Sequence, residues 1–248
     1  MTSTVRVPPK CWCASVAAVN GDVDVAAAAA LIGEPARAAL LLALTEAEYL
    51  PARELAARAG IAPSTASGHL ARLLDGRLVV AHRSGRHRYF RLANAEVAAA
   101  IEALSAIAPP RPVRSLREAT LGQALREART CYDHLAGRLG VEVAAVLERE
   151  GVLVYEDGAE YRLGESAAGY LQTEFAIDVP ELQQQRRAVA RVCLDWSERR
   201  RHVAGALGAA LTSSLLERGW VRRRDGNRSL EVTAAGSEAL AQRFGIVY

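Results

Sequence analysis

The chain has 248 residues and a formal net charge of +3; half of the residues are hydrophobic and only 5% are aromatic. This length is enough for more than one modest domain, and four cysteines are too few for a disulfide framework in a chain of this size. The apolar stretch 25–32 is too short to span a bilayer, and Asp22 and Asp24 before it argue against a signal peptide. We expect a cytoplasmic protein with no membrane association.

The N-terminal segment 1–21 shows no sustained hydrophobic period and contains Pro8, Pro9 and Gly21, so we expect a flexible arm. Cys11 and Cys13 in this arm are either metal ligands or residues without a specific role. A helix over about 22–31 and a second helix over 35–44 are predicted to follow, separated by Gly33 and Glu34.

The segment 51–92 has the most specific pattern in the chain. It contains a short apolar-periodic helix over 52–59, a break at Gly60, a second helix beginning at Pro63, and two strand-like runs around Ser84-Gly85. A helix, a tight turn, a second helix and a basic hairpin are typical of a winged helix-turn-helix. The second helix of such a unit enters the major groove of DNA, and the hairpin lies on phosphates.

The residue types in this segment suit DNA binding. Nine Arg stand against five carboxylates between Glu34 and Ala95, a net charge of +4, as phosphate binding requires. Small hydroxyl side chains let a helix approach base edges closely. The candidate DNA-binding residues are Ser64, Thr65, Ser67, Gly68, His69 and Arg72 on the helix and Arg83, Arg86, His87 and Arg88 on the hairpin.

Residues 23–107 resemble the ArsR-type bacterial transcriptional repressors. The resemblance is carried by GEPARAALLLAL, LAARAG, STASGHLARLLDGRLV and RSGRHRYFRL. One departure is Ala62 before Pro63, where the family often has a polar helix cap. The metal sites of the family cannot be carried over, because 54–60 contains no Cys and 96–107 contains no His.

The resemblance also implies a homodimer that binds double-stranded DNA with a palindromic operator, since two recognition helices would meet two half-sites. The predicted helix over 96–107 would contribute to the dimer core, with Val97, Ile101, Leu104 and Ala108 on one stripe. The prolines of 109–112 then end this DNA-binding and dimerisation domain, 22–108. A linker, 109–127, begins there, with a connecting helix expected over 113–130.

The remaining segment, 128–248, contains an internal duplication. Copies over about 128–178 and 190–247 share the motif Ala-Arg-x-Cys-x-Asp, a His that opens His-(Leu/Val)-Ala-Gly-x-Leu-Gly, and a Gly eleven residues later. Each copy echoes the DNA-binding segment but has a shorter spacing between its glycines. We therefore expect two degenerate winged-helix-like repeats whose recognition helix is cut by more than one turn. The second copy carries a basic hairpin, Arg222–Arg224 and Arg228, which is either an auxiliary phosphate contact or a solvated turn.

Cysteines and histidines fall at matching positions in the two copies. Cys, Asp and His supply donors that a borderline-soft divalent ion accepts, and Cys131 and His134 are three residues apart, as on one helical face. Three alternatives remain open: simple core packing, a small-molecule pocket lined with Tyr132, Trp196 and Trp220, and a metal or thiol sensor. The candidate effector or metal residues are Cys131, Asp133, His134, Cys193, Asp195 and His202.

These observations predict a mainly α chain with small β-hairpins, consisting of a winged helix-turn-helix and two repeats. We expect a DNA-binding repressor whose operator binding is modulated by a divalent metal or a small molecule. The alternative is a constitutive DNA-binding protein whose C-terminal half serves assembly only. An enzyme is not expected, since no glycine-rich cofactor turn follows a strand.

Overall fold

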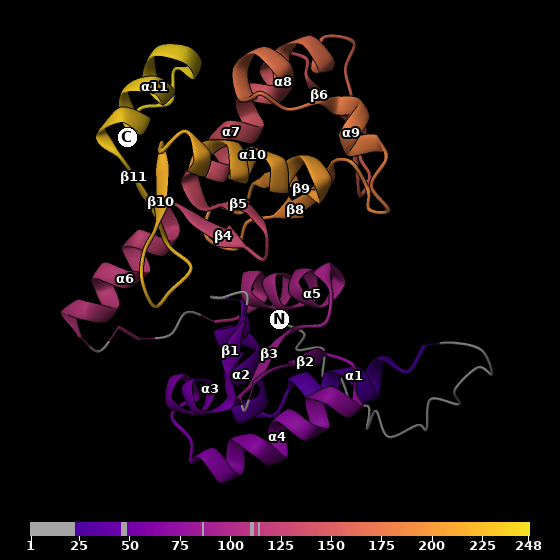
Figure 1. Cartoon of the computed structure of the whole chain (residues 1–248), viewed down its shortest axis with the longest axis vertical. Coiled ribbons are helices and arrows are strands. Elements are labelled where there is room, and N and C mark those ends of the chain that lie inside the picture. Colours follow the sequence, from indigo (N-terminus) through magenta and orange to yellow (C-terminus); the bar gives the residue numbers. More distant parts are fainter. Residues whose placement is uncertain (1–22, 46–48, 86, 110–111, 114) are drawn as a thin grey trace, which may run out of the picture.

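The computed structural model describes residues 23–45, 49–85, 87–109, 112–113 and 115–248 (Figure 1). The predicted N-terminal arm, with Cys11 and Cys13, lies outside the described residues. The first part of the described chain forms a winged-helix domain. Its elements are α1 (Val25–Ile32), α2 (Pro35–Leu44), β1 (Leu50–Pro51), α3 (Ala52–Ala59), α4 (Pro63–Asp75), β2 (Val79–Ser84), β3 (His87–Leu92) and α5 (Ala95–Ile107).

Helix α3 has the predicted bounds, and α4 begins at Pro63 as predicted. Gly60 ends α3 with φ of 67°, a left-handed conformation that glycine adopts without strain. Pro63 occupies the first turn of α4, and Ala62 provides no side-chain cap. Leu55, Leu70 and Leu73 turn inward to a core that also includes side chains from α2, the sheet and α5. The strand order β1-β3-β2 puts β3 in the centre of the sheet and β2 at its edge, and these two strands form the wing.

The first and last helices of this domain leave apolar side chains uncovered. Helix α1 buries none of its residues, and Val25 is 68% exposed. Helix α5 buries Ile101, but Leu104 and Ile107 are exposed, at 42% and 80%. The predicted stripe on α5 is therefore covered only in part within one chain. No single described helix is long and apolar enough to cross a membrane; α1 and α2 meet such a criterion only as a pair, bent by 84°.

The linker helix α6 (Leu116–Glu127) connects the winged-helix domain to the duplicated region. The expectation that this helix continues to residue 130 is wrong, because Arg129 and Thr130 belong to a strand. The first repeat comprises β4 (Arg129–Cys131), β5 (His134–Ala136), α7 (Gly137–Arg149), β6 (Leu153–Tyr155), β7 (Tyr161–Leu163) and α8 (Ala167–Phe175). After α9 (Val179–Gln183), the second comprises β8 (Arg191–Leu194), β9 (Arg201–Ala204), α10 (Gly205–Glu217), β10 (Val221–Arg223), β11 (Leu230–Val232) and α11 (Ala234–Phe244).

The two repeats have the same order of elements: hairpin, helix, hairpin, helix. A shortened recognition helix is not found, since α7 and α10 each have 13 residues, as α4 does. The repeats differ from a helix-turn-helix at their start, where a β-hairpin precedes α7 and α10 instead of a helix. The shorter spacing between the glycines of each repeat reflects this difference, because the hairpin leads directly into α7 or α10 without a separate turn.

The two repeats pack against each other about a local two-fold axis, so that each makes the same contacts with the other. The backbone of β4 forms hydrogen bonds with the second repeat next to β11, and the backbone of β8 forms the equivalent bonds with the first repeat next to β7. Helix α7 packs on β9 while α10 packs on β5. Matching residues consequently meet at the axis, where the rings of Phe175 and Phe244 stack with centroids 5.2 Å apart. Such isologous contact joins equivalent surfaces, and the two repeats share one hydrophobic core.

The duplicated Gly-x-Leu-Gly motif has a packing function. Gly137 and Gly205 begin α7 and α10 with φ of 76° and 84°, where other residues are strained. A Cβ on Gly140 or Gly208 would lie 2.6 or 2.3 Å from the carbonyl oxygen of Leu135 or Val203. Each helix therefore starts pressed against its own hairpin.

We expect the substitution Gly208→Ala to lower the free energy of unfolding by about 1–3 kcal/mol, because the added methyl group would displace the β9 backbone. Urea denaturation followed by circular dichroism measures this loss. The matched control is Gly122→Ala in α6, where nothing lies within 4 Å of the added carbon and helix propensity favours Ala by up to about 1 kcal/mol. Equal stability of Gly208→Ala and the unsubstituted protein would contradict the packing function.

Candidate DNA-binding surface and candidate metal centre

Helix α4 presents a polar face to solvent. Ala66, Leu70 and Leu73 are buried on one side of the helix. The opposite side is exposed, and it carries five of the predicted DNA-binding residues: Ser64, Thr65, Ser67, Gly68 and Arg72. The side chains on this face are small near the N-terminus of the helix, and a basic side chain follows one to two turns later. Approach to a DNA groove requires such an arrangement.

His69 does not share this exposed face. Its side chain is 18% exposed, and its Nδ1 lies 3.3 Å from a carboxylate oxygen of Glu34. Glu34 also caps α2 by accepting hydrogen bonds from the backbone N–H groups of Ala36 and Arg37, which lower the pKa of its carboxyl group. The structure therefore assigns His69 to the contact between α2 and α4, and the prediction that it faces bases is corrected.

The wing carries exposed arginines on paired strands. Arg83 and Arg88 are cross-strand partners in the β2–β3 ladder, and both are exposed. The Arg88 guanidinium lies 5.0 Å from the centre of the Phe90 ring, which orients it on the wing. Arg86 lies outside the described residues, and only the backbone of His87, in β3, is described.

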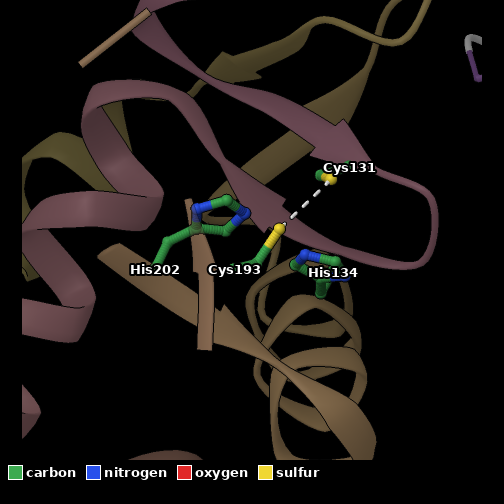
Figure 2. Close-up of side chains that lie close together, drawn as sticks. All are labelled: Cys131, His134, Cys193 and His202. Carbon is green, nitrogen blue, oxygen red and sulfur yellow. Dashed lines mark hydrogen bonds between the residues drawn. The ribbon is translucent and has the colours of Figure 1, made fainter. Parts of the chain in front are cut away.

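Four of the six candidate ligands meet between the repeats (Figure 2). Cys131 and His134 are cross-strand partners at the end of the β4–β5 hairpin, and Cys193 and His202 are partners across β8 and β9. The expectation of a shared helical face is wrong, since a two-residue turn separates Cys131 from His134. One ligand atom from each of the four residues lies within 4.8 Å of every other.

This Cys/His cluster, Cys131, His134, Cys193 and His202, is enclosed. Cys131 is 1% exposed, His134 is 6% exposed, and His202 is fully buried. The two sulfurs are 4.0 Å apart, and the imidazoles stack with centroids 5.1 Å apart. Among the described residues, both ring nitrogens of His202 and Nε2 of His134 have no hydrogen-bond partner.

The surroundings of the cluster shift the pKa values of its members. The hydrogen bond with Cys193 and burial raise the pKa of the Cys131 thiol to about 12. Burial disfavours a charged imidazole, but the Cys131 sulfur and the Asp133 carboxylate raise the pKa of His134 to about 9. The hydrogen bond with Cys193 and burial thus both favour the neutral thiol form of Cys131.

Asp133 and Asp195 lie next to the cluster but have other partners. Asp133 accepts hydrogen bonds from Arg187 at 2.6 Å and lies 3.3 Å from Nδ1 of His134. Burial opposes its charge, but the hydrogen bonds from His134 and Arg187 hold its pKa below the usual range. It orients His134, as outer carboxylates orient ligating histidines. The two aspartates are thus not part of the four-residue cluster.

Asp195 is fully buried and accepts five hydrogen bonds. Its donors are the guanidinium of Arg129 at 2.9 Å, the N–H groups of Gly137, Ser197 and Glu198, and the Ser197 hydroxyl group. Burial alone would raise its pKa, but the charge of Arg129 and these hydrogen bonds hold the pKa of Asp195 well below its usual range. This carboxylate joins the second repeat to the start of α7 in the first.

The repeats contact α5 of the winged-helix domain through buried charges. Glu102 on α5 is 2% exposed; it accepts a hydrogen bond from Arg228 and lies 3.9 Å from Arg129. The basic hairpin of the second repeat therefore does not offer Arg228 to DNA phosphates, because that side chain is buried. Sequence reasoning missed Glu102, although Arg129 stands in the duplicated Ala-Arg-x-Cys-x-Asp motif.

A cavity of about 380 Å³ lies between α5 and the two hairpins. Its lining includes Ala98 of α5, Tyr132, and the cluster residues Cys131, His134 and Cys193. Of the aromatic residues predicted for a pocket, only Tyr132 reaches this cavity: Trp196 lies over Arg129, and Trp220 is buried against Phe244. The hairpins and the winged-helix domain thus face a common space.

One family model agrees with the winged-helix fold of the first domain. A family model described as MarR family matches residues 34–88. Solved structures that match about a third of the chain include NolR from Sinorhizobium fredii, 28% identical, covering 33% of this chain and 81% of that one with a TM-score of 0.31. Another is the homodimeric winged helix-turn-helix domain of Mb0332 from Mycobacterium bovis, 27% identical, covering 36% and 89% with a TM-score of 0.30.

A relative of similar length extends the match through the duplicated region. The uncharacterised HTH-type transcriptional regulator YdfF of Bacillus subtilis (strain 168) is 40% identical over 223 residues, which are 90% of this chain and 98% of the relative. A match of this extent indicates a regulator and not an enzyme, as the sequence predicts. The chain therefore belongs to the helix-turn-helix transcriptional regulators, and the family model described as MarR family matches its winged helix.

Proposed function

We propose that the protein is a dimeric transcriptional repressor of the ArsR type that binds a palindromic operator and whose DNA binding is modulated by a ligand between its C-terminal repeats. The observation that carries this proposal is the exposed polar face of α4 beside the arginines of the wing. Small side chains near the start of the helix leave room for base edges, Arg72 suits a guanine, and Arg83 and Arg88 suit phosphates.

Dimerisation is supported by the uncovered apolar side chains of α1 and α5. Val25, Leu104 and Ile107 are exposed in one chain, and exposed apolar surface of this kind is characteristic of protein–protein contacts. A second copy would cover both helices, since the ArsR-type resemblance assigns the dimer core to them. The resulting pair of α4 helices would meet half-sites about one DNA turn apart.

Regulation by a ligand is favoured over a C-terminal half that serves assembly alone. A domain used only for assembly should be closed against α5, whereas the structure has a cavity there with polar groups in its lining. Such concave sites with a few polar groups are typical of ligand binding.

Selection of bound sequences from a random double-stranded DNA pool tests this function. We expect an inverted repeat, and we expect Arg72→Ala to weaken binding to the selected sequence by about 1–3 kcal/mol and to relax its sequence preference at one position. Arg88→Ala should instead weaken binding to all sequences similarly and reduce the salt dependence of the affinity.

Arg117→Ala serves as the matched control, because this exposed arginine lies on α6 outside the winged-helix domain. Its loss should leave the affinity close to the unsubstituted value. Recovery of no preferred sequence, or an equal loss of affinity in Arg72→Ala and Arg117→Ala, would contradict the role of α4.

A further inference from the structure

The donor set of the Cys/His cluster matches a metal centre. Two thiols and two imidazoles are the ligands of tetrahedral Zn²⁺ sites, in which zinc–sulfur bonds of about 2.3 Å put two sulfurs about 3.8 Å apart. The sulfurs of Cys131 and Cys193 are 4.0 Å apart, and all four ligand atoms lie within 4.8 Å of one another. One ion at the centre of these four atoms would lie close to a ligand atom of each side chain.

The histidines provide an independent indication of a ligand. His202 is fully buried, and neither of its ring nitrogens has a partner in the described part of the chain. Nε2 of His134 is also buried and has no hydrogen-bond partner among the described residues, whereas its Nδ1 faces the Asp133 carboxylate. Buried polar groups without partners are costly, and a cation between the imidazoles would bind one nitrogen from each.

We propose that Cys131, His134, Cys193 and His202 bind one thiophilic divalent cation of the Zn²⁺ class, and that this cation is the effector of the regulator. The effector role rests on the proposed function, whereas binding of the cation does not. As the metal–sulfur bonds form, each thiol releases its proton to solvent. The Asp133 carboxylate orients His134 from outside.

The local two-fold axis explains why the site needs both repeats. Each hairpin supplies one Cys and one His as cross-strand partners, and the axis brings the two pairs together (Figure 2). A disulfide between Cys131 and Cys193 would need the sulfurs at about 2.05 Å and would leave both imidazoles without partners. A four-ligand cation satisfies all four side chains at once.

The site is connected to the DNA-binding domain by short paths. Tyr132, in the turn between two of the ligands, packs against the core of the winged-helix domain and has a left-handed φ of 60°. Arg129, two residues before Cys131, binds Asp195 and lies beside Glu102 on α5. Movement of either hairpin on metal binding would therefore reach α5, and α5 follows the wing directly.

Titration of the reduced, chelator-treated full-length protein with Co²⁺ tests the site, since Co²⁺ bound to thiolates in a tetrahedral site absorbs visible light. We expect one equivalent per chain, displaced by Zn²⁺. Cys131→Ser and His202→Gln should lose this signal. Asp133→Asn should retain it with an affinity about 10- to 100-fold lower, as for other outer-shell partners.

The double variant Cys11→Ser/Cys13→Ser is the matched control, because it removes the other two thiols of the chain and should keep the full equivalent. Circular dichroism checks folding, and the half-buried Cys193→Ser replaces any variant that fails to fold. An unchanged Co²⁺ signal in Cys131→Ser/Cys193→Ser, or no Co²⁺ signal in the unsubstituted protein, would overturn the site.

Operator affinity with and without Zn²⁺ tests the effector role. We expect a difference of about 5- to 150-fold, the usual range of allosteric coupling, and none in Cys193→Ser. Equal affinity of the metal-loaded and chelator-treated proteins would overturn the effector role and leave the site. Failure of both forms to select any DNA sequence would overturn the proposed function, and the Co²⁺ result would still stand.

Discussion

Replacement of Asp195 by asparagine is expected to lower the free energy of unfolding by about 3–5 kcal/mol, because it leaves a buried guanidinium without its counter-charge. Arg129 is fully buried, and its closest carboxylate is Asp195, at 2.9 Å. Glu102 lies farther away, at 3.9 Å. The neutral amide of the variant would also be a weaker acceptor for the N–H of Gly137, which begins α7. Urea denaturation measures the change.

Two further variants separate charge from packing. Asp225→Asn changes an exposed carboxylate in the hairpin of the same repeat, and surface substitutions of this kind stay within about 0.5 kcal/mol. In the double variant Asp195→Asn/Arg129→Met, the unpaired charge is gone, so we expect part of the lost stability to return. A double variant less stable than either single variant would contradict the ion-pair explanation.

Much of the winged-helix domain could be predicted because its signals are local. Gly60 and Pro63 delimit two helices whose apolar periodicity extends over several turns, and the predicted 52–59 helix matches α3. Helix α2 likewise has the predicted bounds. His69 differs from prediction because Glu34 attracts it, and such a tertiary contact is not visible in helical spacing.

The Cys/His cluster could be predicted only in part. The duplication indicates that Cys131 and Cys193 are equivalent, but not that equivalent residues meet at an axis. A Cys and a His three residues apart fit one helical face as well as a two-residue hairpin turn, and strands of three or four residues are too short for alternation to decide. Asp195 was predicted as a ligand. The sequence does not reveal that it pairs with Arg129 instead, because the two residues are 66 positions apart.

The second large effect concerns Glu102, whose carboxylate lies between two arginines of the repeats. It is buried on α5 and contacts Arg228 and Arg129. Because the winged-helix domain and the repeats have separate hydrophobic cores, this carboxylate is a major link between them. We expect Glu102→Gln to lower the stability by about 3–5 kcal/mol, the usual cost of removing one partner of a buried ion pair.

The same substitution should also separate the unfolding of the two domains. The chain has three tryptophans, Trp12, Trp196 and Trp220, so in a Trp12→Phe background the fluorescence reports the repeats alone, whereas circular dichroism reports both domains. The two urea transitions should coincide in the Trp12→Phe protein and diverge after Glu102→Gln, because coincidence of probes indicates a single cooperative unit.

Glu96→Gln is the matched control for this effect. Glu96 lies on the same helix and contacts Arg191 of the repeats at 3.3 Å, but its side chain is 67% exposed, and exposed pairs contribute only about 0–1 kcal/mol. Coincident transitions in both variants would contradict a linking role for Glu102. If Glu102 also transmits the state of the Cys/His cluster to α5, then Glu102→Gln should bind Co²⁺ normally while Zn²⁺ loses its effect on operator affinity, since the site is intact but its connection to the winged helix is weakened.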